Sequence, residues 1–325
     1  MVTHLANRGL LSELSPGLFY LYNMCMAKFK EPAQLHNHSK YSLLDAVPSP
    51  EEWVGWCLES GTPALAVTDH GTAISMFDAL RAKEFIKNYN KEHGTNHPLD
   101  AVHLIPAVEL YVKLNAEDKG HYHITAWAYT TEGYHNLMKL ASIAYQDTVS
   151  YYGSVKARVT FEQIKQYKKG IKFGTGCIVG PIGQAIMRDK DTEKAEQLYL
   201  MYQEIFGDDL YVEFHVGDVT HNFNKATGSF DPFPEEIGHD ECTCDTNKQR
   251  GYNQFLKRMV DKHGGKCIPV TDAHFIKPEH KIIQDCLLKN GNSNGWYFHE
   301  SYHQIRAEEM FAKLQKHLGE RSEEH

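Results

Sequence analysis

The stretch Gln34-Leu-His-Asn-His-Ser-Lys-Tyr-Ser-Leu-Leu-Asp45 contains two histidines, His36 and His38, two positions apart. On an extended strand such residues project to the same face, so both imidazoles would face one region. An H-x-H pair alone is a weak signal in a chain with 20 histidines. Further clusters follow at or just after short apolar runs bounded by turn residues: Thr68-Asp-His-Gly71, Pro106-Ala-Val-Glu109, His121-Tyr-His123, Gly176-Cys177 and Thr271-Asp-Ala-His274. This recurrence is typical of buried strands that carry functional side chains at their ends.

The apolar runs alternate with helical patterns, which predicts an α/β fold built from βα units around a parallel sheet or barrel. Helix starts are recognisable between the runs. Ser49-Pro-Glu-Glu52 combines an N-cap, a proline at the first position and a capping-box glutamate, and Thr160-Phe-Glu-Gln163 is similar. The segment from about 136 to 145 predicts a helix with Leu137, Leu140 and Ala141 on its buried side.

Composition narrows the classes of protein. The 325 residues can bury a large core, and no apolar run approaches the ~20 residues that span a bilayer. Seven cysteines without framework spacing favour a reducing, cytoplasmic setting over a disulfide scaffold. A net charge of −8 argues against nucleic-acid binding through bulk electrostatics, although bound cations would reverse this locally.

In a βα barrel the carboxyl ends of the strands converge on one face, so residues far apart in sequence become neighbours. The candidate metal ligands, which would act in catalysis through bound metals, are His36, His38, Asp45, His70, Glu109, His123, Cys177, Asp272 and His274. Imidazoles mixed with carboxylates and one thiol favour zinc, manganese or iron over calcium, and the set suffices for two to three divalent ions. A carboxylate such as Glu109 can bridge two ions.

The ordered motifs H-x-H-S-x-Y-S-L-L-D, A-L-A-V-T-D-H-G, P-A-V-E-L-Y, H-I-T-A-W-A, G-C and T-D-A-H-F resemble the PHP (polymerase and histidinol phosphatase) domain family. The resemblance is to the version at the N-terminus of bacterial DNA polymerase III alpha subunits, and it covers residues 33 to about 312. It implies a distorted seven-stranded βα barrel, similar to a TIM barrel, with a trinuclear centre at the C-terminal strand ends.

The resemblance also implies how the ligands are shared. His36, His38 and Asp272 would hold one ion, and Glu109 would bridge it to a second ion that His123 and Cys177 complete. Asp45, His70 and His274 would hold the third. Every ligand position is filled, which favours an active hydrolase over a structural domain.

The resulting hypothesis is a metal-dependent phosphoesterase that hydrolyses phosphodiesters in DNA, as a 3′-5′ exonuclease linked to replication and proofreading. DNA with a 3′ end and a replicative polymerase subunit on a separate chain would be its partners. The alternatives are a phosphatase acting on small phosphomonoesters, similar to histidinol phosphatase, and a catalytically silent module that docks polymerase partners. Because no room remains for a palm domain after Met310, we expect no polymerase activity in this chain, and we expect no membrane association.

Other residues allow two interpretations. Asp69 is expected to orient an imidazole rather than to bind metal, and His121 is expected at the surface or behind the ligands. His215 would either line the pocket or simply cap its strand. The basic stretch from Lys156 to Lys172 could guide a nucleic-acid backbone, but such a run is more often a solvated helix face. His239, Cys242 and Cys244 are expected in a reduced loop, since three ligands make a poor structural zinc site.

These patterns divide the chain into an N-terminal extension (1–31), a PHP phosphoesterase domain (32–312) and a charged tail (313–325). Within the domain, residues 216–246 interrupt the alternation with glycines, prolines and acids, which indicates a surface insertion.

Overall fold

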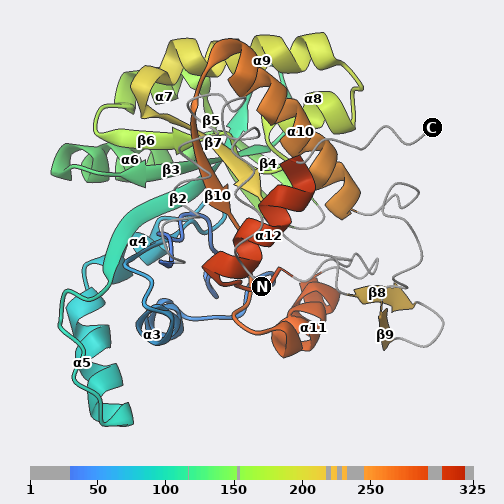
Figure 1. Cartoon of the computed structure of the whole chain (residues 1–325). Helices are drawn as coiled ribbons and strands as arrows, with labels where there is room; N and C mark the ends of the chain where they lie inside the picture. The colour runs from blue at the N-terminus through green and yellow to red at the C-terminus, as the bar shows by residue number, and fades with distance from the viewer. Residues whose placement is uncertain are drawn as a thin grey trace.

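The computed structural model describes residues 30–115, 117–151, 154–216, 221–224, 229–232, 245–291 and 302–318. Most of the expected N-terminal extension, much of the expected insertion including His239, Cys242 and Cys244, and the end of the tail lie outside this part of the chain. The described part is a mixed α/β structure with helices packed around a central sheet (Figure 1).

The central sheet is mixed and follows the order β10-β7-β6-β3-β2-β5-β4, with β1 paired to β2. The strands are β1 (Ala64–Val67), β2 (His103–Lys113), β3 (Tyr122–Ala128), β4 (Thr148–Tyr151), β5 (Ser154–Thr160), β6 (Ile171–Gly174), β7 (Leu210–His215) and β10 (Lys266–Val270). A separate hairpin is formed by β8 (His221–Asn224) and β9 (Ser229–Pro232).

The segment that contains His36 and His38 closes the sheet into a barrel. Gln34 forms a parallel bridge with Leu65 of β1, and Asn37 forms one with Ala273, just after β10. The barrel positions are therefore this segment, β1, β2, β3, β6, β7 and β10. The predicted distorted seven-stranded barrel is confirmed.

Among the seven barrel strands, one differs from the predicted parallel arrangement, and outside the barrel β4 is antiparallel to β5. β3 runs antiparallel to both β2 and β6, whereas β1, β6, β7 and β10 pair in parallel where they meet β2 or one another. The reason is local: a short loop, rather than a helix, joins β2 to β3, and only antiparallel strands can be joined in this way. The start of β3, not its end, thus lies at the face where β1 and β2 end.

The helices are α3 (Pro50–Ser60), α4 (Ile74–Ala79), α5 (Ala82–His93), α6 (Thr131–Ala144), α7 (Phe161–Tyr167), α8 (Pro181–Met187), α9 (Thr192–Phe206), α10 (Asp245–His263), α11 (Lys281–Gly291) and α12 (Ala307–Leu318), with 3-10 turns η1 (Gly207–Asp209) and η2 (Pro278–His280). In Figure 1, α7, α8 and α9 lie at the top of the view, and α3 and α5 lie at the lower left. Both predicted capping boxes are present, at Ser49 and at Thr160.

One helix begins before its predicted start. α6 begins at Thr131, five residues before the predicted start, because Thr130 caps it through the amide of Gly133. Its predicted stripe, Leu137, Leu140 and Ala141, is buried. α12 runs without a break past residue 312, and its Met310 and Leu314 pack in the main hydrophobic core.

In the described part of the chain, no helix is both long enough and apolar enough to span a bilayer.

Candidate metal centre

His36 and His38 are fully buried and their ring centroids lie 5.4 Å apart, as the H-x-H spacing predicts. Asn37, between them, turns away and donates to the carbonyl of Ala66 at 3.2 Å. His38 Nδ1 lies 3.0 Å from Ser42 Oγ, so its Nε2 is the nitrogen directed at the neighbouring acids. The closing segment of the barrel therefore presents two oriented imidazoles to its interior.

Glu109 on β2 is the central carboxylate of the cluster. Its Oε1 lies 3.4 Å from His36 Nε2, and its Oε2 lies 3.3 Å from His123 Nδ1 and also contacts His70 Nδ1. Burial opposes ionisation, but the imidazoles of His123 and His70 outweigh it and hold the pKa of Glu109 well below its usual value. Its two oxygens face different histidines, which is the arrangement that a bridging carboxylate requires.

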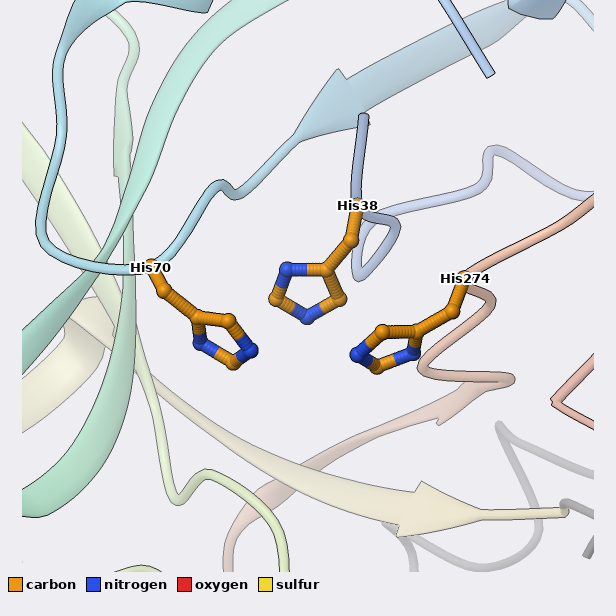
Figure 2. A group of neighbouring side chains, drawn as sticks. All are labelled: His38, His70 and His274. Carbon is orange, nitrogen blue, oxygen red and sulfur yellow. The ribbon is translucent and has the colours of Figure 1, made fainter. Parts of the chain in front are cut away.

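A second group of side chains comes from three separate segments. Figure 2 shows the rings of His38, His70 and His274 turned toward one another, and their ligand atoms lie within 4.8 Å of one another. The His38 ring lies 4.2 Å from that of His70 and 4.3 Å from that of His274. Asp45 Oδ2 is 3.0 Å from His70 Nε2 and 3.5 Å from His274 Nε2. The expected trio of Asp45, His70 and His274 is thus brought together, with His38 beside it.

Asp272 follows β10 and has a left-handed backbone, with φ of 52°. Its Oδ1 lies 3.0 Å from His38 Nε2 and 3.4 Å from His36 Nε2. Its backbone carbonyl lies 2.8 Å from His274 Nδ1, which donates there, so the neutral His274 ring has its lone pair on Nε2, the nitrogen that faces Asp45. One residue therefore both contacts the H-x-H pair and orients the last histidine.

Cys177 is the expected ligand with the weakest geometric link to the others. It is buried, and the amide of Val179 lies 3.5 Å from its Sγ. Burial, reinforced by the negative charges of Asp272 and Glu109, raises the pKa of the thiol well above its usual value. The thiol is therefore affected by the same carboxylates. In the described part of the chain, however, the groups of three potential ligands whose atoms lie within 4.8 Å of one another do not include Cys177.

Glu213, on β7, is a site residue that the sequence reasoning missed. It is fully buried, and its Oε2 accepts from His36 Nδ1 at 2.7 Å. Its Oε1 accepts from Thr125 Oγ1 and, at 2.9 Å, from the amide of Gly176. An acid within the apolar run Leu210–His215 was the available signal, because a carboxylate in a buried strand requires partners.

His215 and Asp69 lie near different histidines of the cluster. The His215 ring is buried 5.1 Å from that of His36, so it lines the centre. Asp69 accepts from Ser39 and from Ser42 Oγ at 2.8 Å. Because Ser42 in turn contacts His38, Asp69 orients an imidazole as expected, but through a serine. His121 is half-buried beside Tyr111, with ring centroids 6.0 Å apart.

The donor atoms fit a set of metal ions. Buried polar atoms without a hydrogen-bond partner in the described part of the chain include His36 Nε2, Asp45 Oδ1, both carboxylate oxygens of Glu109 and His215 Nε2. Such atoms are costly to bury unless something satisfies them. Bound cations would satisfy all of these lone pairs together. Imidazole nitrogens and carboxylate oxygens are suitable ligands for zinc, manganese or iron.

Comparison with known proteins points to one family. The family model described as PHP domain matches residues 34–216. DNA polymerase III subunit alpha of Deinococcus radiodurans is 29% identical over 274 residues, which cover 80% of this chain and 17% of that protein. The corresponding subunits of Chlamydia muridarum and Thermus aquaticus are each 28% identical, over 78% and 79% of this chain. The chain spans about a fifth of the length of these relatives (17%, 19% and 18%).

PHP domains bind metals, and the family is one of metal-dependent phosphoesterases. Since the match covers more than half of the sequence, the chain belongs to the PHP domain family, in the version related to DNA polymerase III alpha subunits.

Proposed function

We propose that this chain hydrolyses phosphodiester bonds in DNA as a metal-dependent 3′-5′ exonuclease linked to replication. The observation that carries the proposal is the cluster of imidazoles and carboxylates around Glu109, in which several buried nitrogen and oxygen atoms have no hydrogen-bond partner in the described part of the chain. The relatives are named DNA polymerase III subunit alpha, which favours DNA over a small phosphomonoester as the substrate.

The proposed ligands are the nine residues named from the sequence. In this assignment His36, His38 and Asp272 would hold one ion, Glu109 would be shared with a second that His123 and Cys177 would complete, and Asp45, His70 and His274 would hold the third. Bound divalent ions supply an activated water and neutralise charge at phosphorus. Hydrogen bonds to one ring nitrogen orient three of the histidines toward the centre. Glu213 contacts His36, Ser42 contacts His38, and the Asp272 carbonyl contacts His274.

The proposal is tested with a 5′-labelled oligonucleotide that has a recessed 3′ end, with added zinc or manganese. His38→Ala and Asp272→Asn each remove a group that faces the centre, and we expect turnover to fall by about 100-fold or more, since metal assistance is worth several kcal/mol. His135→Ala is the matched control, because His135 is exposed on α6.

Unchanged turnover in folded His38→Ala protein of measured metal content would contradict the assignment. Hydrolysis of a phosphomonoester without shortening of the oligonucleotide would instead support the small-molecule phosphatase. Full metal content without turnover of either substrate would indicate a docking module.

A further inference from the structure

Lys156 differs from the cations around it. It lies on β5, two residues before Arg158, and the adjacent strand β2 ends at Lys113. Asp147 pairs with both of these neighbours, and its Oδ1 is 2.6 Å from Arg158 Nη2. Within the described ranges, no carboxylate forms an ion pair with the Lys156 ammonium. Its charge is thus not neutralised by a direct partner there.

Tyr111 holds the Lys156 ammonium in place. Lys156 Nζ donates to Tyr111 Oη at 2.8 Å and lies 4.9 Å from the centroid of the ring. The tyrosine is 4% exposed, and its ring packs on Gly71, where an added Cβ would lie 2.7 Å from ring carbons. Gly71 also has φ of 61°, so a side chain is disfavoured there on two grounds. The tyrosine is therefore a fixed support for the lysine.

The same tyrosine ring contacts the proposed metal ligands. Its centroid lies 5.0 Å from that of His123, edge to face, and 6.2 Å from that of His70, in a stacked arrangement. Burial lowers the pKa of Lys156, and the negative charges of Asp45 and Glu109 oppose this effect. The ammonium is therefore linked to two proposed ligands through one tyrosine side chain, and it contacts the hydroxyl of that side chain rather than a carboxylate.

We propose that Lys156, positioned by Tyr111, binds a non-bridging phosphate oxygen of the substrate on the side of the centre formed by His70 and His123. An ammonium has three donors, and Tyr111 Oη accepts only one of them. Hydrogen bonds from a lysine ammonium to a phosphate are charge-assisted and strong. Because the inference rests on the proposed phosphoesterase function, its test must not depend on turnover.

The probe is inorganic phosphate, titrated calorimetrically into the full chain loaded with zinc or manganese. Lys156→Gln should weaken phosphate binding by about tenfold, the loss expected for one charge-assisted contact. Lys156→Arg should restore part of the affinity, and Tyr111→Phe, which keeps the ring over Gly71, should weaken binding to a smaller extent. The matched control is Lys262→Gln, because Lys262 lies on α10 and pairs with Glu196 at 2.6 Å.

Metal content, measured on the same samples, should be unchanged in Lys156→Gln. On an oligonucleotide substrate the variant should raise KM more than it lowers kcat. The inference is overturned if wild-type protein does not bind phosphate, if Lys156→Gln binds it as tightly as wild type, or if the variant loses metal together with phosphate. Phosphate binding that depends on Lys156, without turnover of any phosphoester, would support the inference while refuting the proposed function.

Discussion

Replacing Glu213 with glutamine should weaken metal binding without disturbing the fold. Glu213 Oε1 accepts from Thr125 Oγ1 and from the Gly176 amide, while Oε2 accepts from His36 Nδ1 at 2.7 Å. Glutamine has the same shape but only one carbonyl oxygen. If that oxygen keeps the two Oε1 contacts, the amide NH₂ faces His36 Nδ1, which must then accept a hydrogen bond.

A neutral His36 that accepts at Nδ1 carries its proton on Nε2, the nitrogen 3.4 Å from both Glu109 and Asp272. That nitrogen could no longer act as a ligand without loss of the new hydrogen bond. Changes to such supporting partners typically cost about 10- to 100-fold in metal affinity, which corresponds to about 1.4 to 2.8 kcal/mol.

The assay is calorimetric titration of zinc or manganese into chelator-treated protein, with elemental analysis after dialysis and circular dichroism as a check of folding. Glu162→Gln, the same chemical change at a side chain that is 80% exposed on α7, is the control. If Glu213→Gln bound metal as tightly as wild type, the carboxylate would not set the His36 tautomer, and the reasoning would be refuted.

Two further predictions concern the same region. Gly174→Ala would place a Cβ 1.8 Å from Glu213 Oε1 and 2.1 Å from Thr125 Oγ1. Urea unfolding should therefore show a free energy of unfolding that is about 1–3 kcal/mol lower, because the site is overpacked. An unchanged midpoint would mean that the strand shifts to make room for the methyl group. For pH dependence, burial opposes protonation of His70, but Glu109 and Asp45 raise its pKa to about 10. In metal-free protein, the protonated His70 stabilises the fold fully below its unfolded pKa of about 6.5, and this stabilisation declines as pH rises toward 10. The urea midpoint measured with chelator should therefore be lower at pH 9.5 than at pH 6. A midpoint that rises over this range would contradict the pairing of His70 with the two acids.

Much of the local structure follows from local sequence. The helix starts at Ser49 and Thr160 were predictable, because a capping box depends on residues only three positions apart. The buried stripe of α6 was predictable for the same reason, while its start was not, since Thr130 lacks the glutamate or glutamine that completes a capping box.

The direction of β3 could not be predicted from its apolar pattern. A strand has the same alternation in either direction, and only pairing with β2 and β6 shows that β3 is antiparallel. This pairing changes how His123 reaches the site. It lies near the start of its strand, beside Tyr111, rather than at a strand end.

The sequence by itself determined which donor atoms are available and where they lie along the chain: imidazoles, carboxylates and a thiol at the edges of short apolar strands, in the order typical of the PHP family. Only the tertiary structure decided which of them are neighbours. Glu213 contacts His36 across 177 residues because closure of the barrel places β7 within reach of the first segment. Such contacts depend on strand order, direction and register around the whole barrel, which no local spacing of residues encodes.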